Sequence, residues 1–564
     1  MVERESRLVF EEPFLFFYIH NKTVVKLQDA SGLDEEATRS LKVLLAWMET
    51  NFREDWDEAD ALFARGKVNS KHYSKLFRPS ELAVSQNHNN QTDMFTAFKF
   101  GYSPIYTEMV PCTYEFDGTL TWLPRVIPSF NENCSRTGIV TEGIYGGRSS
   151  LESGGGLVNI SDLDLYPIRF AEEELERKLI ARGHKFWRLR KKCLVCHGEV
   201  DGGDRYQAER RYMIDYAMYK RLHRATEATK LRFYVSADEY DETSSAFFAC
   251  LPPTILGFSF AKKSWEHLSV DRITDVTWNK TAFDQLVAPD ETKELIQAMV
   301  TVHGDRSNAA QDIISGKGQG LLILLHGGPG TGKTLTAESI AEVQERPLYR
   351  VTCGDIGIEP KEVEQYLGDV LEIGKAWGCV VLLDEADVFL EERSFTDQKR
   401  NAVISSTPPH PNFDIQHTNP TVFLRVLEYY DGILILTTNR VGSFDEAFKS
   451  RIQLALAYPR LNEEDRLKIW QNFIQMLPRS GQRVDMEDLK MNLNKLALVE
   501  INGRQIRNAV TMARHLAKFR HEMLRYKHMQ DALRSVQRFN KYLSDVKGLS
   551  DDEWAKADKL RLGD

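Results

Sequence analysis

The sequence predicts an α/β fold with a parallel sheet in its C-terminal half, preceded by a mixed α and β region. Residues 321–325 are continuously apolar, too short for an amphipathic helix, and are followed by a glycine-rich loop and a helical stretch. Strand and helix then alternate through residues 348–353, 360–377 and 379–383, and residues 433–439 form another apolar strand. This alternation is typical of parallel sheets, because two parallel strands need a long crossover between them.

The loop after the first of these strands has the residues of a phosphate-binding site. It is Gly327-Gly328-Pro329-Gly330-Thr331-Gly332-Lys333-Thr334, and Leu335 continues into a helix that extends to Gln344. The glycines allow backbone N–H groups to close around a phosphate, and the helix begins with the positive end of its dipole. We expect Lys333 to reach the β- and γ-phosphates and the Thr334 hydroxyl to bind Mg²⁺. The alternative is a glycine turn that binds nothing.

Polar residues end two of the later strands. Asp384 and Glu385 follow strand 379–383, and Asn439 ends strand 433–439. We expect Asp384 to hold Mg²⁺ through water and Glu385 to polarise the water that attacks the γ-phosphate. Asn439 lies where open α/β sheets bind ligands, so we expect it to position that water. The alternatives are an acidic strand end and a strand-ending turn.

Two arginines are further candidates for contact with the nucleotide. An arginine at the γ-phosphate stabilises charge in the transition state, and Arg451 is placed to do this. Its alternative is a surface arginine that pairs with Asp445 or Glu446. Residues 453–458 predict a fifth strand, and the region that follows is helical. There Arg504 opens a helix that can fold back onto the nucleotide.

The composition predicts a soluble protein of several domains. The chain has 564 residues, 42% of them hydrophobic, a net charge of −9 and seven scattered cysteines. A net negative charge gives no basic field for nucleic acid, and the few cysteines indicate a reducing compartment. Neither a secretory signal nor an apolar run long enough to span a membrane is visible. We therefore expect an intracellular location, in the cytoplasm or the nucleus.

The N-terminal half predicts α and β elements without a clear site. Apolar residues at helical spacing in 41–52 and a charged stretch at 171–182 predict helices, and residues 112–116 and 138–144 alternate like strands. The glycine-rich segments within residues 146–156 predict a surface loop, because no helix follows them at once.

One motif and one basic run in this half invite functional interpretations. Cys193-Leu194-Val195-Cys196-His197 matches a haem-attachment string and half of a zinc site, but a second ligand pair is missing, and two cysteines at the end of a strand are the simpler interpretation. The basic run 187–192 is compatible with nucleic acid, but a solvated strand face explains it.

Taken in order, the phosphate loop, Asp384-Glu385, Asn439, Arg451 and Arg504 resemble the motifs of AAA+ ATPases of the AAA group. The resemblance covers about residues 271–530. It implies a P-loop core with a five-stranded parallel sheet of order 5-1-4-3-2, a helical lid, ATP and Mg²⁺ as ligands, and Arg451 acting on the nucleotide of a neighbouring subunit. That arrangement implies a ring, possibly a hexamer.

Other stretches resemble large AAA proteins of filamentous fungi that carry an N-terminal domain without an assigned activity. The most similar are 384–391, 423–432 and, before the ATPase, 182–186 and 213–216. The expected organisation is an N-terminal α+β domain (1–252), a linker (253–270) that follows two prolines, the ATPase core (271–460), a helical lid (461–530) and a helical tail (531–564).

Three features depart from the family pattern. Residues 354–360 lack the aromatic residue that AAA motors use to thread a polypeptide, which puts threading in question. Arg451 follows a serine where a second arginine is common. Residues 405–421 look inserted, and both a real proline-containing loop and an artefact of the gene model stay open.

The leading hypothesis is an oligomeric ATP hydrolase that remodels an unknown protein client, with no nucleic acid and no membrane span involved. A second hypothesis is a scaffold that binds ATP, assembles and turns over very little. A small-molecule kinase or GTPase with the same loop is a third. The order of the motifs favours the first of these.

Overall fold

The computed structural model describes fifteen parts of the chain, and the statements that follow concern these parts alone: 15–27, 34–87, 94–102, 109–117, 120–124, 156–163, 165–198, 210–223, 244–304, 320–352, 355, 360–386, 430–440, 449–480 and 483–547. The chain forms two compact units. The first consists of residues 1–197, 212–258 and 265–274, and the second of residues 198–211, 259–264 and 275–564.

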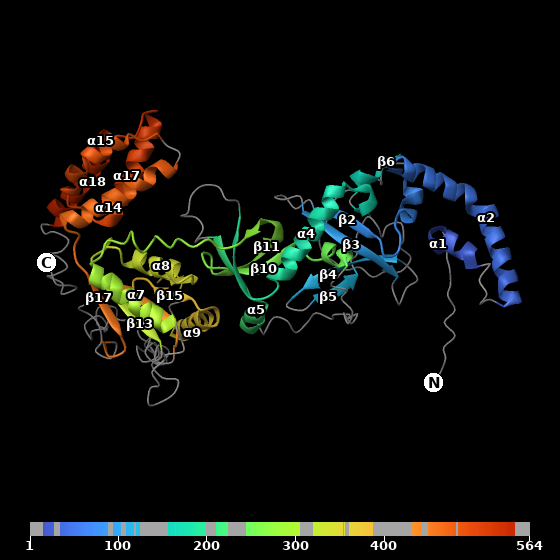
Figure 1. The fold of residues 1–564 in the computed structure, drawn as a ribbon, viewed down its shortest axis with the longest axis horizontal. Helices are drawn as coiled ribbons and strands as arrows, with labels where there is room; N and C mark the ends of the chain where they lie inside the picture. The colour runs from blue at the N-terminus through green and yellow to red at the C-terminus, as the bar shows by residue number, and fades with distance from the viewer. Residues whose placement is uncertain are drawn as a thin grey trace, which may run out of the picture. The chain divides into compact units, whose positions relative to one another are not determined.

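The second unit is built on a parallel sheet of five strands (Figure 1). They are β13 (Leu321–Gly327), β14 (Leu348–Val351), β15 (Val380–Leu383), β16 (Ile433–Thr438) and β17 (Leu454–Tyr458). Their order β14-β15-β16-β13-β17 confirms the expected 5-1-4-3-2 arrangement. The inner strands β13, β15 and β16 are apolar up to their last two residues or throughout, because both of their faces are buried there.

Three helices accompany this sheet, α7 (Asp290–Gly304), α8 (Lys333–Val343) and α9 (Pro360–Trp377). The C-terminal end of α8 is held by an ion pair. Glu342 accepts hydrogen bonds from the Arg211 guanidinium, Nη1 to Oε1 at 2.8 Å and Nη2 to Oε2 at 2.9 Å. Arg211 also lies over the Trp278 ring, 4.2 Å from its centroid. A carboxylate in the last helical turn is unfavourable to the helix dipole, and the guanidinium offsets it.

A helical bundle follows the sheet. Its helices are α14 (Glu463–Met476), α15 (Met486–Met491), α16 (Leu493–Ala497), α17 (Gly503–Phe519) and α18 (Tyr526–Lys547). Asn462 and Asn502 begin α14 and α17 with capping boxes, which satisfy the first N–H groups of each helix. We expected a separate tail from residue 531, but Met529, Ala532 and Leu533 of α18 are buried in the bundle core. The tail prediction is wrong as far as residue 547, because α18 completes this core.

The first unit contains two helices followed by two antiparallel sheets. Its helices are α1 (Leu15–Leu27) and α2 (Glu35–Ala64). One sheet has the order β5-β4-β3-β2-β7, from β2 (Leu82–Asn87), β3 (Met94–Tyr102), β4 (Met109–Phe116), β5 (Leu120–Pro124) and β7 (Leu165–Pro167). The other has the order β11-β10-β9-β8-β12, from β8 (Cys193–His197), β9 (Arg211–Ile214), β10 (Thr254–Ser259), β11 (Ser264–Ser269) and β12 (Ile273–Thr274). A separate short antiparallel ribbon pairs β1 (Lys67–Val68) with β6 (Val158–Asn159).

Helix α4 (Glu173–Leu189) contributes to the hydrophobic cores of both antiparallel sheets of the first unit. Leu179 is buried in the core of the first sheet, and Phe186 in the core of the second. The small helices α5 (Tyr216–Leu222) and α6 (Ser245–Ala249) complete the unit, and α6 packs against α4. Gly183 is required at this contact, since a Cβ there would lie 2.0 Å from the Phe248 carbonyl oxygen.

Two further predictions for this half are corrected. Residues 253–270 are not a linker, because β10 and β11 form an edge of the second sheet, and Ile255 and Phe258 are buried. The basic run does not lie on a strand face either. Its first residues end α4, where Arg190 stacks on Trp187 with 3.5 Å between Cζ and the ring centroid.

Some predictions concern residues that lie outside the described parts. These are the strand at 138–144, the glycine-rich loop up to residue 155, nearly all of the threading-loop region 354–360 and the inserted segment 405–421.

Candidate nucleotide site

The phosphate loop connects β13 to α8 and depends on glycine at two positions. Gly327 has φ of 146°, and a Cβ there would lie 2.2 Å from the Tyr458 carbonyl oxygen of the neighbouring strand. Gly330 has φ of 75°, and its Cβ would lie 2.6 Å from Asn502 Oδ1. Both positions exclude other residues by backbone conformation and by space, so the loop is closely packed on both sides.

Lys333 brings the loop together with the end of β16. Its ammonium donates to the carbonyl oxygens of Gly327 and Gly328 at 2.9 and 2.7 Å, and to Asn439 Oδ1 at 2.8 Å. Only 7% of Lys333 is exposed. The residue expected to bind phosphate and the residue expected to position the attacking water thus lie in direct contact, although 106 positions separate them.

Asp384 forms the second cluster of the site. Its Oδ1 accepts hydrogen bonds from Thr334 Oγ1 at 3.0 Å and from Thr437 Oγ1 at 2.6 Å. Its Oδ2 accepts from Arg350 Nη2 at 2.6 Å. Mg²⁺ prefers oxygen ligands and keeps several of its waters, so an adjacent hydroxyl and carboxylate suit it. Thr334 and Asp384, both predicted metal residues, have the chemistry and the proximity to hold this ion.

Glu385 follows Asp384 but points elsewhere. Its side chain is exposed, while its backbone N–H donates to Thr437 Oγ1 at 3.0 Å. Its φ of 59° lies in the left-handed region, which residues with a side chain adopt uncommonly. The conformation separates the two acids, so one carboxylate faces the loop threonine and the other stays open to solvent.

Arg451 lies at the opposite end of the sheet from the phosphate loop of its own chain. It precedes β17, whose Leu454 pairs with Ile323 and whose Tyr458 pairs with Gly327. Gln453, two residues after Arg451, donates its backbone N–H to the Leu322 carbonyl. At about 3.3 Å per residue, Arg451 is therefore roughly 20 Å from the loop. It cannot contact a phosphate bound in the same chain.

The helical bundle reaches the phosphate loop through the first turn of α17. The Gly503 N–H donates to the Gly330 carbonyl at 3.0 Å, and Asn502 lies against Gly330. Arg504 follows in the same turn and is exposed. The first turn of α17 therefore folds back onto the phosphate loop, as expected, and the Arg504 side chain lies at the surface of that turn.

Sequence reasoning missed three residues of this site, Arg350, Thr437 and Asn502. Thr437 was accessible in principle, because strand pairing of Leu383 with Leu436 sets Asp384 opposite Thr437. Arg350 lies in a strand that carries no motif, and Asn502 lies two residues before Arg504, so only the assembled sheet and bundle show what they contact. His326, just before the loop, has its pKa lowered by burial and by the nearby Lys333 charge, which keeps the imidazole neutral.

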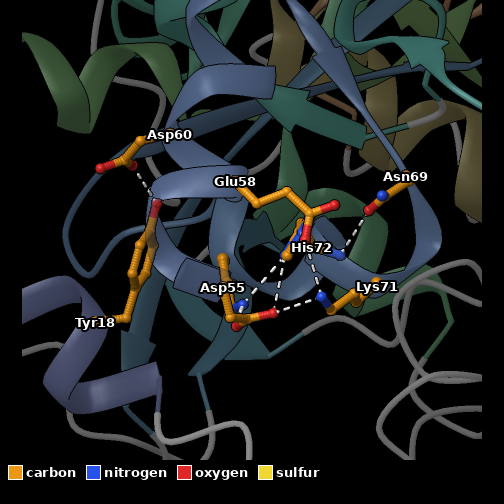
Figure 2. Close-up of polar contacts among 8 residues, drawn as sticks. Tyr18, Asp55, Glu58, Asp60, Asn69, Lys71 and His72 are labelled. Atoms are coloured by element: carbon orange, nitrogen blue, oxygen red, sulfur yellow. Dashed lines mark hydrogen bonds and ion pairs between the residues drawn. The ribbon is translucent and has the colours of Figure 1, made fainter. Parts of the chain in front are cut away.

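A second polar cluster lies in the first unit, around α2 and the 3-10 helix Ser70–Leu76 (Figure 2). Ligand-type atoms of Asp55, Glu58 and His72 lie within 4.8 Å of one another. Lys71 Nζ, however, bridges the two carboxylates at 2.8 and 3.0 Å, and Lys75 pairs with Asp55 and contacts His72 Nδ1. Two ammonium groups already balance two carboxylates, so this cluster is a salt-bridge network rather than a metal site.

The cysteine motif lies in strand β8, as expected. Cys193 Sγ donates to the Leu189 carbonyl at 3.6 Å, whereas Cys196 is buried. Residues three apart on a strand project to opposite faces, so the two thiols cannot bind one ion together.

In the described parts of the chain, no helix has the length and apolar character needed to cross a membrane.

Comparisons with known proteins match this part of the chain to described families. Residues 323–460 match the family model described as ATPase family associated with various cellular activities (AAA), and residues 461–550 match the fungal AAA+ ATPase lid domain. The Lon protease of Mycolicibacterium smegmatis is 26% identical over 261 residues, which are 42% of this chain and 32% of the relative. A putative 26S proteasome regulatory subunit homolog of Methanothermobacter thermautotrophicus is 25% identical over 218 residues, 38% of this chain and 54% of the relative.

Among solved structures, the FIGL-1 AAA domain in complex with ADP is 20% identical, with a TM-score of 0.33, and the match covers 47% of this chain and 90% of that chain. The chain spans about a third to a half of the length of the curated relatives named above. Both family models lie within the second unit. The chain therefore carries an AAA ATPase domain followed by an AAA+ lid domain of the fungal type.

Proposed function

We propose that this protein binds ATP with Mg²⁺, hydrolyses it as an oligomer, and uses the cycle to remodel a protein client. The proposal rests on one observation. Four residues meet at the carboxyl end of the parallel strands: Lys333, Asn439, Thr334 and Asp384. The AAA match over the same residues supports ATP as the nucleotide.

The chain's own residues divide the chemistry between two clusters. Lys333 neutralises phosphate charge, and the N–H groups of the loop and of α8 bind phosphate oxygens. Thr334 and Asp384 would hold Mg²⁺, which supplies charge neutralisation when bound. Glu385 takes a proton from the attacking water, and Asn439 holds that water in line with the γ-phosphate. Arg504 extends from the lid turn that touches Gly330.

The position of Arg451 supports a shared site. Because it is about 20 Å from its own phosphate loop, an arginine with a catalytic role must serve a neighbouring copy. The proposed assembly is a ring, with six copies as the expected number. The relatives named Lon protease and proteasome regulatory subunit homolog support a protein as the client. The proposed setting is intracellular.

The test uses substitutions that leave nucleotide binding intact. Glu385→Gln removes the general base, so we expect unchanged ATP affinity and turnover lowered by about a hundredfold or more. Glu464→Gln, an exposed position in the first turn of α14, is the matched control and should keep full activity. Parent-like turnover of Glu385→Gln would remove Glu385 from its role. A parent that binds no adenine nucleotide would refute the whole proposal.

A mixing experiment tests the shared site. Arg451→Ala should bind ATP in its own loop but fail to hydrolyse it. When it is mixed with Glu385→Gln, interfaces that pair an intact Glu385 with an intact Arg451 should restore part of the turnover. Specific activity of the parent should also rise with protein concentration as copies assemble. A scaffold that only binds ATP would show negligible turnover at every concentration, and two inactive variants would stay inactive together.

A further inference from the structure

Arg350 contacts the candidate metal carboxylate from the neighbouring strand. It lies in β14, opposite Leu382 of β15, and Asp384 is two residues further along the same face. Its Nη2 lies 2.6 Å from Asp384 Oδ2, and the backbone fixes the approach because Asp384 N–H donates to the Val351 carbonyl. The contact thus follows from the strand register.

The two oxygens of Asp384 have different partners. Oδ1 accepts from two neutral hydroxyls, those of Thr334 and Thr437. Oδ2 accepts from a guanidinium, which is always charged. Arg350 therefore supplies positive charge at the carboxylate that would hold Mg²⁺. Its side chain is 48% exposed and that of Asp384 is 11% exposed, so the arginine can swing into solvent while the carboxylate stays in place.

We propose that Arg350 is a positioning residue that occupies Asp384 in the absence of metal and competes with Mg²⁺ for it. The inference rests on the proposed nucleotide site. In the metal-free state, Arg350 fixes the Asp384 rotamer and neutralises its charge, which would otherwise repel a nucleotide phosphate. Arg350 would give up this contact when Mg²⁺ is bound at Asp384 with the nucleotide, because the two cations compete for one carboxylate. Arg350 thereby sets how strongly nucleotide binding depends on the metal.

The size of the effect follows from the exposure of the pair. Ion pairs that are open to water contribute up to about 1 kcal/mol, which corresponds to roughly a fivefold change in a binding constant. Without Arg350, Mg²⁺ no longer competes with an internal cation, whereas metal-free nucleotide meets an uncompensated carboxylate. Both changes increase the ratio of nucleotide affinity in Mg²⁺ to that in EDTA.

The experiment measures this ratio directly by binding, without turnover. The full-length chain is titrated with the fluorescent nucleotide mant-ADP in Mg²⁺ and in EDTA. We expect Arg350→Gln to raise the affinity ratio severalfold, up to about fivefold, relative to the parent. Arg350→Lys keeps the charge and should stay close to the parent. Arg520→Gln removes a comparably exposed partner of Asp531 on α18 and should leave the ratio unchanged.

A double-mutant cycle separates this role from a structural one. In the Asp384→Asn background the competition has no target, so Arg350→Gln should leave the ratio unchanged there. An unchanged ratio in the single variant would overturn the inference. So would a lower ratio, because Arg350 would then hold Asp384 for the metal. If Arg350→Gln does not fold, a parent-like ratio for Arg350→Lys supports the inference and a raised ratio contradicts it. Failure of the parent to bind mant-ADP would instead refute the nucleotide site itself.

Discussion

The ion pair between Arg211 and Glu342 allows a quantitative prediction about the helix that begins at the phosphate loop. Arg211 is buried, donates to both Glu342 oxygens at 2.8 and 2.9 Å, and also donates to the Thr277 carbonyl at 3.4 Å. Glu342 accepts a further bond from the Asn279 N–H at 2.9 Å. Arg211→Met keeps much of the side-chain volume over Trp278 but removes the charge and the donors.

The expected loss of stability is about 3 kcal/mol. Removing one partner of a buried ion pair typically destabilises by about 3–5 kcal/mol, because the other charge stays buried alone. The Glu342 side chain is 15% exposed and so keeps some hydration, which favours the lower end of that range. At about 2 °C per kcal/mol for a unit of this size, the melting transition should fall by about 6 °C.

The assay combines thermal unfolding with hydrogen exchange of peptides from α8. Arg211→Met should lower the transition and speed exchange in that helix. Arg520→Met is the matched control, because its partner Asp531 is exposed and such pairs contribute at most about 1 kcal/mol. The double variant Arg211→Met with Glu342→Met should regain most of the loss, since both charges are gone. A single variant no worse than the control, or a double variant as unstable as the single one, would refute the reasoning.

Two further predictions concern the loop and the first unit. Gly330→Ala places a Cβ 2.6 Å from Asn502 Oδ1 in a backbone conformation with φ of 75°, and about 1–2 kcal/mol of strain should weaken mant-ADP binding roughly tenfold. Gly368→Ala in α9, which meets no atom within 4 Å, should bind normally, and equal affinities would contradict the packing argument. The pKa of His72 is lowered by burial and by the Lys75 charge, so the folded state favours the neutral imidazole. Its contribution is complete above the usual histidine pKa of about 6.5 and is lost as the pH falls below it. Urea unfolding should therefore show the parent losing more stability than His72→Gln between about pH 7 and pH 5, and parallel slopes would count against this.

The sequence predicted the second unit well because its signals are local. Buried parallel strands are apolar throughout, and the loop glycines and strand-ending acids occur at fixed positions relative to them. Strand order then places Lys333 beside Asn439 without further information. The two prolines before residue 254 misled the domain prediction, because they precede a strand rather than a linker.

Contacts that join distant segments were not predictable in the same way. Arg350 reaches Asp384 from the neighbouring strand, and Arg211 reaches Glu342 over 131 positions. Neither arginine belongs to a spacing pattern, so nothing in the sequence distinguishes it from a solvated side chain. In the first unit, alternation predicted strands such as β4 but not their order, because antiparallel sheets allow many topologies.

The backbone of Glu385 has a consequence for any attempt to make this protein more robust. A glycine at this position would adopt φ of 59° without strain and would favour folding, yet it would lack the carboxylate. Selection for thermal stability alone would therefore favour glycine at this position, and under the proposed mechanism that variant would not hydrolyse ATP. A screen for more stable variants of this chain therefore needs to measure ATP hydrolysis as well as thermal stability.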